Sequence, residues 1–237
     1  MILFYAPEVT EIPVLPKDEA QHCLRVLRMR EGDIIDLTDG KGNFYKAEIT
    51  VPEINNCRLI ILETIPQTKT WTSFIEIAVA PTKNSDRMEW LAEKAVEIGI
   101  DRISFIRSRF SERQEIKTGR IRKIMIAAMK QSLKSTLPGL EEIIDLDSLI
   151  RKGFDGSRFI AHCATGNNPP SLLKVYHAGN NVQVLIGPEG GFSEQEVESA
   201  IVNGIIPVSL GKSRLRTETA ALVSCQTIQL IEQLHQF

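Results

Sequence analysis

The sequence is poor in the side chains that build metal centres and disulfide frameworks. Its four cysteines, Cys23, Cys57, Cys163 and Cys225, form no CxxC pair, and none has a histidine neighbour at zinc-ligand spacing. The four histidines, His22, His162, His177 and His235, share no common spacing. We therefore expect reduced structural thiols, histidines that are structural or exposed, and no metal cofactor.

Long apolar runs and a secretory leader are also missing. The N-terminal residues MILFYAPEV lack a basic region, and nowhere do about 18 apolar residues follow one another. Hydrophobic residues still make up 43% of the 237 positions, which is enough for a sizeable core. These features predict a cytoplasmic protein that folds without disulfides and does not enter a membrane.

Two common nucleotide-binding fingerprints, GxGxxG and GxxxxGK followed by serine or threonine, are absent, which argues against a Rossmann dinucleotide site and P-loop chemistry. Two other glycine-bearing segments are present. GPEGG, residues 187–191, follows the apolar run Val182 to Ile186, and LGKSRLRTETAAL, residues 210–222, leads into the last predicted helix. Glycines at a strand-to-helix turn let backbone amides approach a ligand, although a tight structural turn would look the same.

Charge is nearly balanced overall, with a net charge of -2, but it is unevenly distributed. Between Arg102 and Lys134 ten basic residues stand against two acidic ones, and Arg25, Arg28 and Arg30 form a smaller basic group. Such a run is either a solvated face or the binding surface for a polyanion. The excess within an otherwise acidic chain favours a polyanion partner.

The pattern of predicted elements changes along the chain. Up to about residue 70 it indicates short strands (2–5, 33–39, 43–51 and 57–65), a turn at 39–42, and one helix, Lys17 to Arg28, with Asp18 as N-cap. After the polar segment 66–72, predicted strands at 73–81, 102–106, 158–163, 182–186 and 206–210 alternate with helices at 85–98, 119–135, 193–203 and 217–234. Ser193 to Glu196 form a predicted capping box, and Thr217 is expected to cap the last helix. The fold class is therefore α/β with a mainly parallel sheet, whose ligands bind at the carboxyl ends of the strands.

Several segments together resemble a known family. They are HCLRVLRMREGD (22–33), KNSDRMEWLAEKAVEIGIDRI (83–103), SERQ (111–114), KQSLKSTLP (130–138), IGPEGGFS (186–193) and LGKSRLRTETA (210–220). Together they are similar to the bacterial 16S rRNA uracil-N3 methyltransferases of the SPOUT superfamily. The resemblance implies a PUA-like RNA-binding β-barrel at 1–70 and a trefoil-knotted methyltransferase domain at 71–237. It further implies S-adenosyl-L-methionine as cofactor, a homodimer, and a uridine in the decoding region of 16S rRNA, within the small ribosomal subunit, as substrate.

Matching positions carry the family's functional residues onto this chain. The cofactor is expected to contact Leu185, Gly187, Pro188, Gly190, Gly191, Leu210, Gly211, Leu215, Arg216, Thr217 and Ala220. Methylation at N3 also requires loss of the N3 proton, and the charged candidates for catalysis are Arg216, Glu218 and Glu189, none of which stands out as the base. Arg216 could instead form a salt bridge with Glu218 or Glu189. The expected RNA contacts are Arg25, Arg28, Arg30, Arg109, Arg113, Arg122, Lys123, Lys130 and Lys134, the last standing where relatives commonly have arginine.

Two other functions stay open. A knotted methyltransferase with the same cofactor could act on tRNA or 23S rRNA, and a non-catalytic RNA-binding assembly factor could keep the loops in vestigial form. The intact GPEGG and LRTETA segments favour an enzyme.

Overall fold

The computed structural model describes residues 2–162 and 169–235, so Cys163 lies outside the described residues. The chain divides into two compact units. The N-terminal unit comprises residues up to 70 together with 126–137, and the C-terminal unit comprises 71–125 and the chain from 138 onward. The predicted boundary after residue 70 assigns residues 126–137 to the second domain, but in the structure they pack with the first unit.

The N-terminal unit is a curled five-stranded sheet in the order β1-β3-β4-β5-β2. Its strands are β1 (Leu3–Tyr5), β2 (Val14–Leu15), β3 (Ile34–Thr38), β4 (Asn43–Val51) and β5 (Cys57–Pro66). Register shifts between Lys46 and Ala47 and between Ile49 and Val51 mark irregularities that bend the β4–β5 ribbon. The expected small β domain is confirmed, as an open curled sheet with β1 and β2 at its two edges.

A buried carboxylate shapes the turn between β3 and β4. Asp39 accepts hydrogen bonds from the backbone N–H groups of Lys41 and Asn43 and from the hydroxyl of Tyr45. Burial alone would raise the pKa of Asp39, but these donors and the Asn43 amide hold it below its ordinary value. The same turn binds residues 135–137, because Leu137 N–H donates to the Gly40 carbonyl (2.8 Å). This contact explains why 126–137 belongs to the N-terminal unit.

The predicted helix from Lys17 to Arg28 begins at the predicted residue, but its predicted N-cap and its end are wrong. Helix α1 spans Lys17–Gln21 and is preceded by Pro16 as N-cap, so Asp18 lies inside its first turn. A π-helical turn, η1 (His22–Val26), follows. Arg28 then adopts a left-handed conformation (φ 57°), which a regular helix cannot continue.

The C-terminal unit is built on a six-stranded, fully parallel sheet, which confirms the predicted α/β class. The strand order is β11-β9-β10-β6-β7-β8. The strands are β6 (Ile75–Val79), β7 (Arg102–Arg107), β8 (Gly139–Asp145), β9 (Ser157–Ala161), β10 (Val182–Ile186) and β11 (Ile206–Val208). The implied knot stays a prediction.

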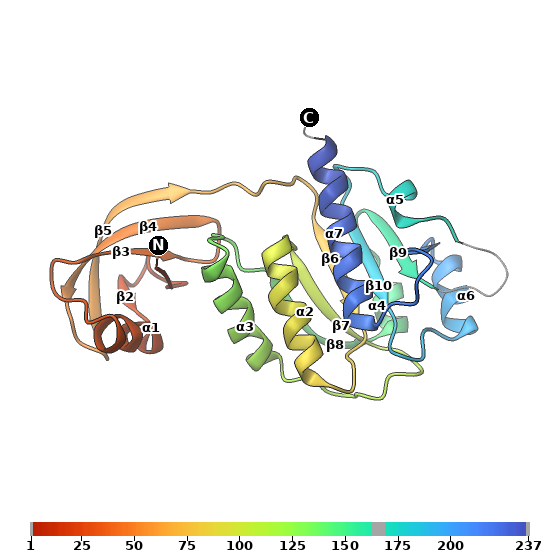
Figure 1. Ribbon diagram of the computed structural model, residues 1–237, viewed down its shortest axis with the longest axis horizontal. Helices are drawn as coiled ribbons and strands as arrows, with labels where there is room; N and C mark the ends of the chain where they lie inside the picture. Colours follow the sequence, from red (N-terminus) through yellow and green to blue (C-terminus); the bar gives the residue numbers. More distant parts are fainter. Residues whose placement is uncertain (1, 163–168, 236–237) are drawn as a thin grey trace. The chain divides into compact units, whose positions relative to one another are not determined.

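Helices cover both faces of this sheet (Figure 1). Helix α7 (Thr217–His235) packs against α2 (Ser85–Ile98) and β6, while α4 (Leu146–Lys152) and α6 (Glu194–Val202) share a hydrophobic cluster with the strands. Helix α5 (Leu172–Val175) is a single turn, and α3 (Thr118–Gln131) ends before the predicted Ser135 because Leu133 is left-handed (φ 52°). In the described residues, no helix is long and apolar enough to cross a membrane.

A buried carboxylate fixes the C-terminal half of α7. Glu232 accepts hydrogen bonds from Ser73 (2.6 Å), from the Tyr176 hydroxyl (2.6 Å) and from the Gly179 N–H (2.9 Å). Burial alone would raise the pKa of Glu232, but these donors and the backbone of Thr72 lower it below its ordinary value of 4.5.

The Glu232 network predicts a pH-dependent contribution to stability. A lowered folded-state pKa stabilises the protein above the unfolded pKa, and this contribution is lost as pH falls through the folded value. We expect Glu232→Gln to lower the free energy of unfolding by about 2 kcal/mol at pH 7, with the difference from wild type shrinking as the pH falls below the ordinary carboxyl pKa of 4.5. Urea unfolding at pH 7 and at low pH measures this difference, and Glu198→Gln, at an exposed glutamate on α6, is the control. A pH-independent difference would contradict this role.

Candidate active site

The carboxyl ends of four strands meet at one edge of the parallel sheet. Ile186 of β10 lies opposite Val79 of β6 and Ala161 of β9, and Val208 of β11 also lies opposite Ala161. The segments that follow β6, β10 and β11 therefore emerge side by side. The Ala80 N–H donates to the Ile186 carbonyl (2.9 Å) and extends the β6–β10 pairing beyond the strands.

The GPEGG segment forms a tight turn between β10 and α6. A Cβ atom at Gly187 would lie 3.2 Å from the Phe192 ring and from the Gly191 backbone, and Gly191 is left-handed (φ 75°). The Gly191 N–H closes the turn on the Pro188 carbonyl (2.9 Å). The predicted capping box is confirmed, since Ser193 and Glu196 bond each other's backbone N–H groups at the start of α6. Glycine at 187 and 191 is thus required by the shape of this turn.

The second glycine-bearing segment is irregular and leads directly into α7. Gly211 has φ 128°, and its N–H donates to the Ser209 hydroxyl (3.2 Å). Thr217 is the first residue of α7 rather than its cap, and its hydroxyl donates to the Gly187 carbonyl (3.0 Å). This bond brings together the two segments that the sequence placed at strand ends.

The three charged candidates lie in different environments. Glu189 and Arg216 are exposed, whereas Glu218, the second residue of α7, is only 5% exposed. Glu218 faces Arg87 rather than Arg216, with Arg87 Nε 3.7 Å from Oε1. Its other oxygen, Oε2, is buried without a hydrogen-bond partner among the described residues. A buried carboxylate oxygen without a donor is costly, which indicates a place for a ligand's donor group.

The remaining cofactor candidates differ in burial. Leu185 is fully buried in the core cluster beneath the turn, and Pro188 is also buried. Gly190 is exposed and packs against Phe110, whose Cβ would lie 3.1 Å from an added Cβ. Leu215 and Ala220 are partly exposed, as is Leu210. The structure thus leaves the turns accessible while Leu185 supports them from below.

The predicted RNA-binding residues fall into both units. Arg25, Arg28 and Arg30 are exposed in the N-terminal unit, where Lys130 forms an ion pair with Glu19 (2.6 Å) and Lys134 is partly buried. In the C-terminal unit, Arg122 and Lys123 are exposed on α3. Two others help to shape the site edge: Arg113 donates to the Lys83 carbonyl (2.9 Å), and Arg109 donates its N–H to Glu196 (2.7 Å) and its guanidinium to Gln195 (3.3 Å).

Sequence reasoning missed Arg87, the third residue of α2. It lies within the segment KNSDRMEW that carried part of the resemblance, but a charged residue in a helical pattern gives no sign of a partner on a distant helix. Its helix begins at the same edge, where Asn84 caps it by accepting the Asp86 N–H (2.9 Å).

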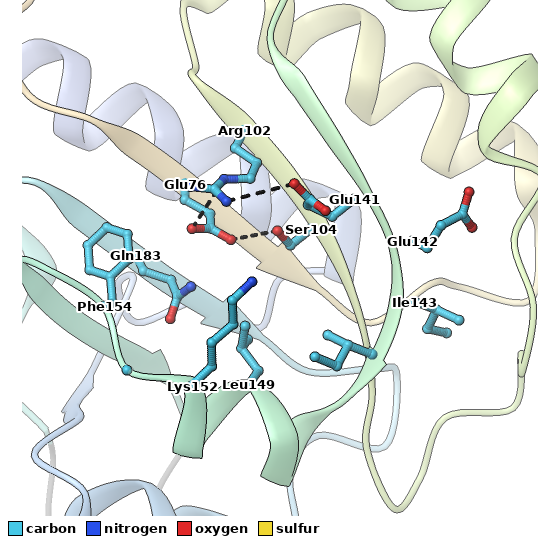
Figure 2. Close-up of a pocket in the computed structure, with 12 residues that line it drawn as sticks. Glu76, Arg102, Ser104, Glu141, Glu142, Ile143, Leu149, Lys152, Phe154 and Gln183 are labelled. Carbon is cyan, nitrogen blue, oxygen red and sulfur yellow. Dashed lines mark hydrogen bonds and ion pairs between the residues drawn. The ribbon is translucent and has the colours of Figure 1, made fainter.

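A separate cavity of about 380 Å³ lies on the sheet away from these turns (Figure 2). Its walls include Arg102, Ser104 and Lys152, and Glu76 accepts a hydrogen bond from the Ser104 hydroxyl (2.5 Å). Glu76 and Gln183, which also line the cavity, are each the second residue of their strands. At β6 and β10 the cavity therefore lies near the amino ends of the strands, whereas the candidate site lies at their carboxyl ends. Within the described residues, no group of three or more side chains is arranged to hold a metal ion.

Comparison with known proteins decides the family. The model of an RNA methyltransferase domain matches residues 69–229, and that of an RNA methyltransferase PUA domain matches 15–62. The chain belongs to the RNA methyltransferase family. This methyltransferase is 46% identical to a probable rRNA methyltransferase from Porphyromonas gingivalis, with a TM-score of 0.94 and coverage of 99% of this chain and 100% of that one.

Two further relatives are similar to this methyltransferase over nearly its whole length. The ribosomal RNA small subunit methyltransferase E of Neisseria gonorrhoeae, solved with S-adenosyl methionine bound, is 31% identical, with a TM-score of 0.85 and 98% of each chain covered. The protein of the same name from Rickettsia conorii is 28% identical over 92% of this chain and 89% of its own length. The resemblance inferred from the sequence motifs is thereby confirmed.

Proposed function

We propose that this methyltransferase transfers a methyl group from S-adenosyl-L-methionine to N3 of a uridine in the decoding region of 16S rRNA. The observation that carries the proposal is the hydrogen bond between Thr217 and Gly187, which joins the two glycine-bearing turns into one site at the edge of a parallel sheet. The Neisseria gonorrhoeae relative, whose name specifies the small-subunit RNA, supports both the cofactor and the substrate.

The residues present fit the cofactor. Gly187 and Gly191 shape a tight turn that side chains at these positions would strain, and the Glu218 oxygen without a donor lies at the start of the adjoining helix. When bound, S-adenosylmethionine supplies an electrophilic methyl group. The turns at 187–191 and 210–217 would hold it through backbone groups and through the partly exposed Leu210, Leu215 and Ala220.

Loss of the N3 proton is the second requirement of the reaction. Among the charged candidates, Glu218 has the environment that best supports a direct role, because its buried oxygen lacks a donor. We propose that it accepts the N3–H of the target uracil. Arg216 is exposed at the same turns and is proposed to contact an RNA phosphate or the developing anion, whereas the carboxylate of Glu189, also exposed there, stays a candidate base.

The decisive experiment is methyl transfer to small ribosomal subunits from a strain lacking the gene. Purified protein and labelled S-adenosylmethionine should methylate these subunits, and base mapping should place one 3-methyluridine in the decoding region of 16S rRNA. Transfer to tRNA or to 23S rRNA alone would overturn the substrate. An absence of both transfer and cofactor binding would favour a non-catalytic assembly factor.

Exposed basic residues are proposed to bind the RNA backbone. Each phosphate contact to single-stranded RNA contributes about -0.7 to the slope of log affinity against log salt concentration. We expect Arg122→Gln and Lys123→Gln each to reduce the slope by about that amount, whereas Lys174→Gln, an exposed lysine on α5, should not change it. Filter binding at several salt concentrations measures it, and unchanged slopes would remove both residues from the interface.

We further propose that the protein forms a homodimer. Leu230 and Leu234 of α7 are 46% and 75% exposed, and large apolar side chains grouped on one helix favour a protein partner. Analytical ultracentrifugation should give twice the chain mass of 26.5 kDa.

A further inference from the structure

Arg87 occupies a position that helix stability does not explain. It is the third residue of α2, and a cation in the first turn of a helix is opposed by the positive end of the macrodipole. Its side chain is 34% exposed, so it is neither buried by packing nor fully solvated. Glu218 has the opposite relation to its own helix, because a carboxylate is favoured in the first turn of α7. At the starts of α2 and α7, Arg87, whose charge is disfavoured by its helix dipole, therefore lies beside Glu218, whose charge is favoured by its own helix dipole.

The ion pair engages only part of the guanidinium. Arg87 Nε lies 3.7 Å from Glu218 Oε1, a separation that holds the two charges together but is longer than a hydrogen bond. Among the described residues this is the ion pair that Arg87 makes, and its partly exposed guanidinium has terminal nitrogens left over to donate to a further acceptor. Glu218 Oε2 likewise lacks a donor. A buried acceptor without a partner and a guanidinium with donors to spare therefore lie within one pair of side chains, beside the turn at Gly187.

We propose that Arg87 is a further substrate-contact residue, which donates to a carbonyl oxygen of the target uracil. The proposal rests on the proposed function. The uracil ring presents an N3–H donor flanked by two carbonyl acceptors, which is complementary to one carboxylate oxygen and one guanidinium edge. When N3 loses its proton, negative charge spreads onto the carbonyl oxygens, and a guanidinium fixed beside them stabilises that charge. The N3 proton passes to Glu218 Oε2, the methyl group passes from the sulfonium to N3, and Glu218 afterwards releases the proton to water.

The same geometry gives Glu218 a positioning role toward Arg87. Arginine side chains have many rotamers, and an anion that holds the guanidinium by Nε limits the directions in which the terminal nitrogens can donate. Cytosine also presents a ring carbonyl, but its N3 carries no proton to donate to Glu218. The pair would therefore favour uracil over cytosine at the target position.

The test compares Arg87→Gln and Arg87→Lys with wild type and with Arg151→Gln, an exposed arginine on α4 that serves as a matched control. Single-turnover methylation of small subunits is followed between pH 6 and 10, and S-adenosylmethionine affinity is measured by calorimetry. We expect Arg87→Gln to lower the rate by roughly 10²- to 10³-fold with little change in cofactor affinity. The pH–rate profile of Arg87→Gln should shift toward higher pH, because N3 then loses its proton without the stabilising guanidinium. Arg87→Lys should recover part of the rate.

Each outcome separates this proposal from the proposed function. An inactive wild type would sink the proposed function itself. An active wild type combined with an unshifted profile for Arg87→Gln would show that Arg87 does not act on uracil ionisation. Loss of cofactor affinity in Arg87→Gln would assign the residue to the cofactor site or to folding and would equally overturn the proposal.

Discussion

Replacing Glu218 with glutamine is expected to lower the rate of methyl transfer by roughly 10²- to 10⁴-fold while the protein stays folded. Glutamine keeps the size of the side chain but cannot accept the N3 proton. Cofactor affinity should change little, because the carboxylate is proposed to face the uracil. Single-turnover methylation and calorimetry measure the two effects, and Glu198→Gln on α6 is the matched control. A Glu218→Gln rate equal to wild type would remove Glu218 from the chemistry.

The stability of Glu218 variants offers an independent check. Leaving a buried acceptor unpaired costs about 1–3 kcal/mol, and Arg87 is exposed enough to regain water when its partner is removed. Glu218→Leu should therefore be inactive but as stable as wild type, or more stable. This combination is typical of a residue kept for function at the expense of stability. A large drop in Tm would instead indicate that the ion pair with Arg87 holds the two helices together.

Replacing Gly187 with valine is expected to weaken S-adenosylmethionine binding by roughly 100-fold or more. Any Cβ at this position already lies 3.2 Å from the Phe192 ring and from the Gly191 backbone, so a branched side chain must displace the turn. The displacement would also disturb the Gly187 carbonyl that receives the Thr217 hydroxyl. Calorimetry with S-adenosylmethionine measures the loss.

Gly187→Ala and Gly204→Ala complete this test. Alanine at 187 requires the neighbours to move by only a few tenths of an ångström, so we expect an intermediate loss of affinity, which can be measured even if the valine variant does not fold. Gly204 is left-handed (φ 77°) after α6 with open space around it, so alanine there should cost about 1 kcal/mol of stability without weakening cofactor binding. Equal cofactor affinity in wild type and Gly187→Val would contradict the assignment of this turn.

The elements that the sequence predicted well are those with strong local signals. Met88, Leu91 and Ala95 recur at helical spacing before Gly99, and the structure has α2 at the predicted residues. The run Val182–Ile186 is β10, because a strand buried on both faces of a parallel sheet is mainly apolar, here with Gln183 as its single polar residue. By contrast, β8 (GLEEIID) was missed, since an edge strand carries polar residues and resembles a loop.

What the sequence determined by itself was the α/β class, the two glycine-bearing turns and the family, because hydrophobic periodicity, glycine requirements and motif order are all local properties of the chain. Tertiary structure alone decided which residues meet. The bond from Thr217 to Gly187, the pairing of Glu218 with Arg87 instead of Arg216, and the packing of residues 126–137 with the N-terminal unit each join distant segments. No local pattern encodes such contacts, since they depend on the strand order that brings separate loops to the same edge of the sheet.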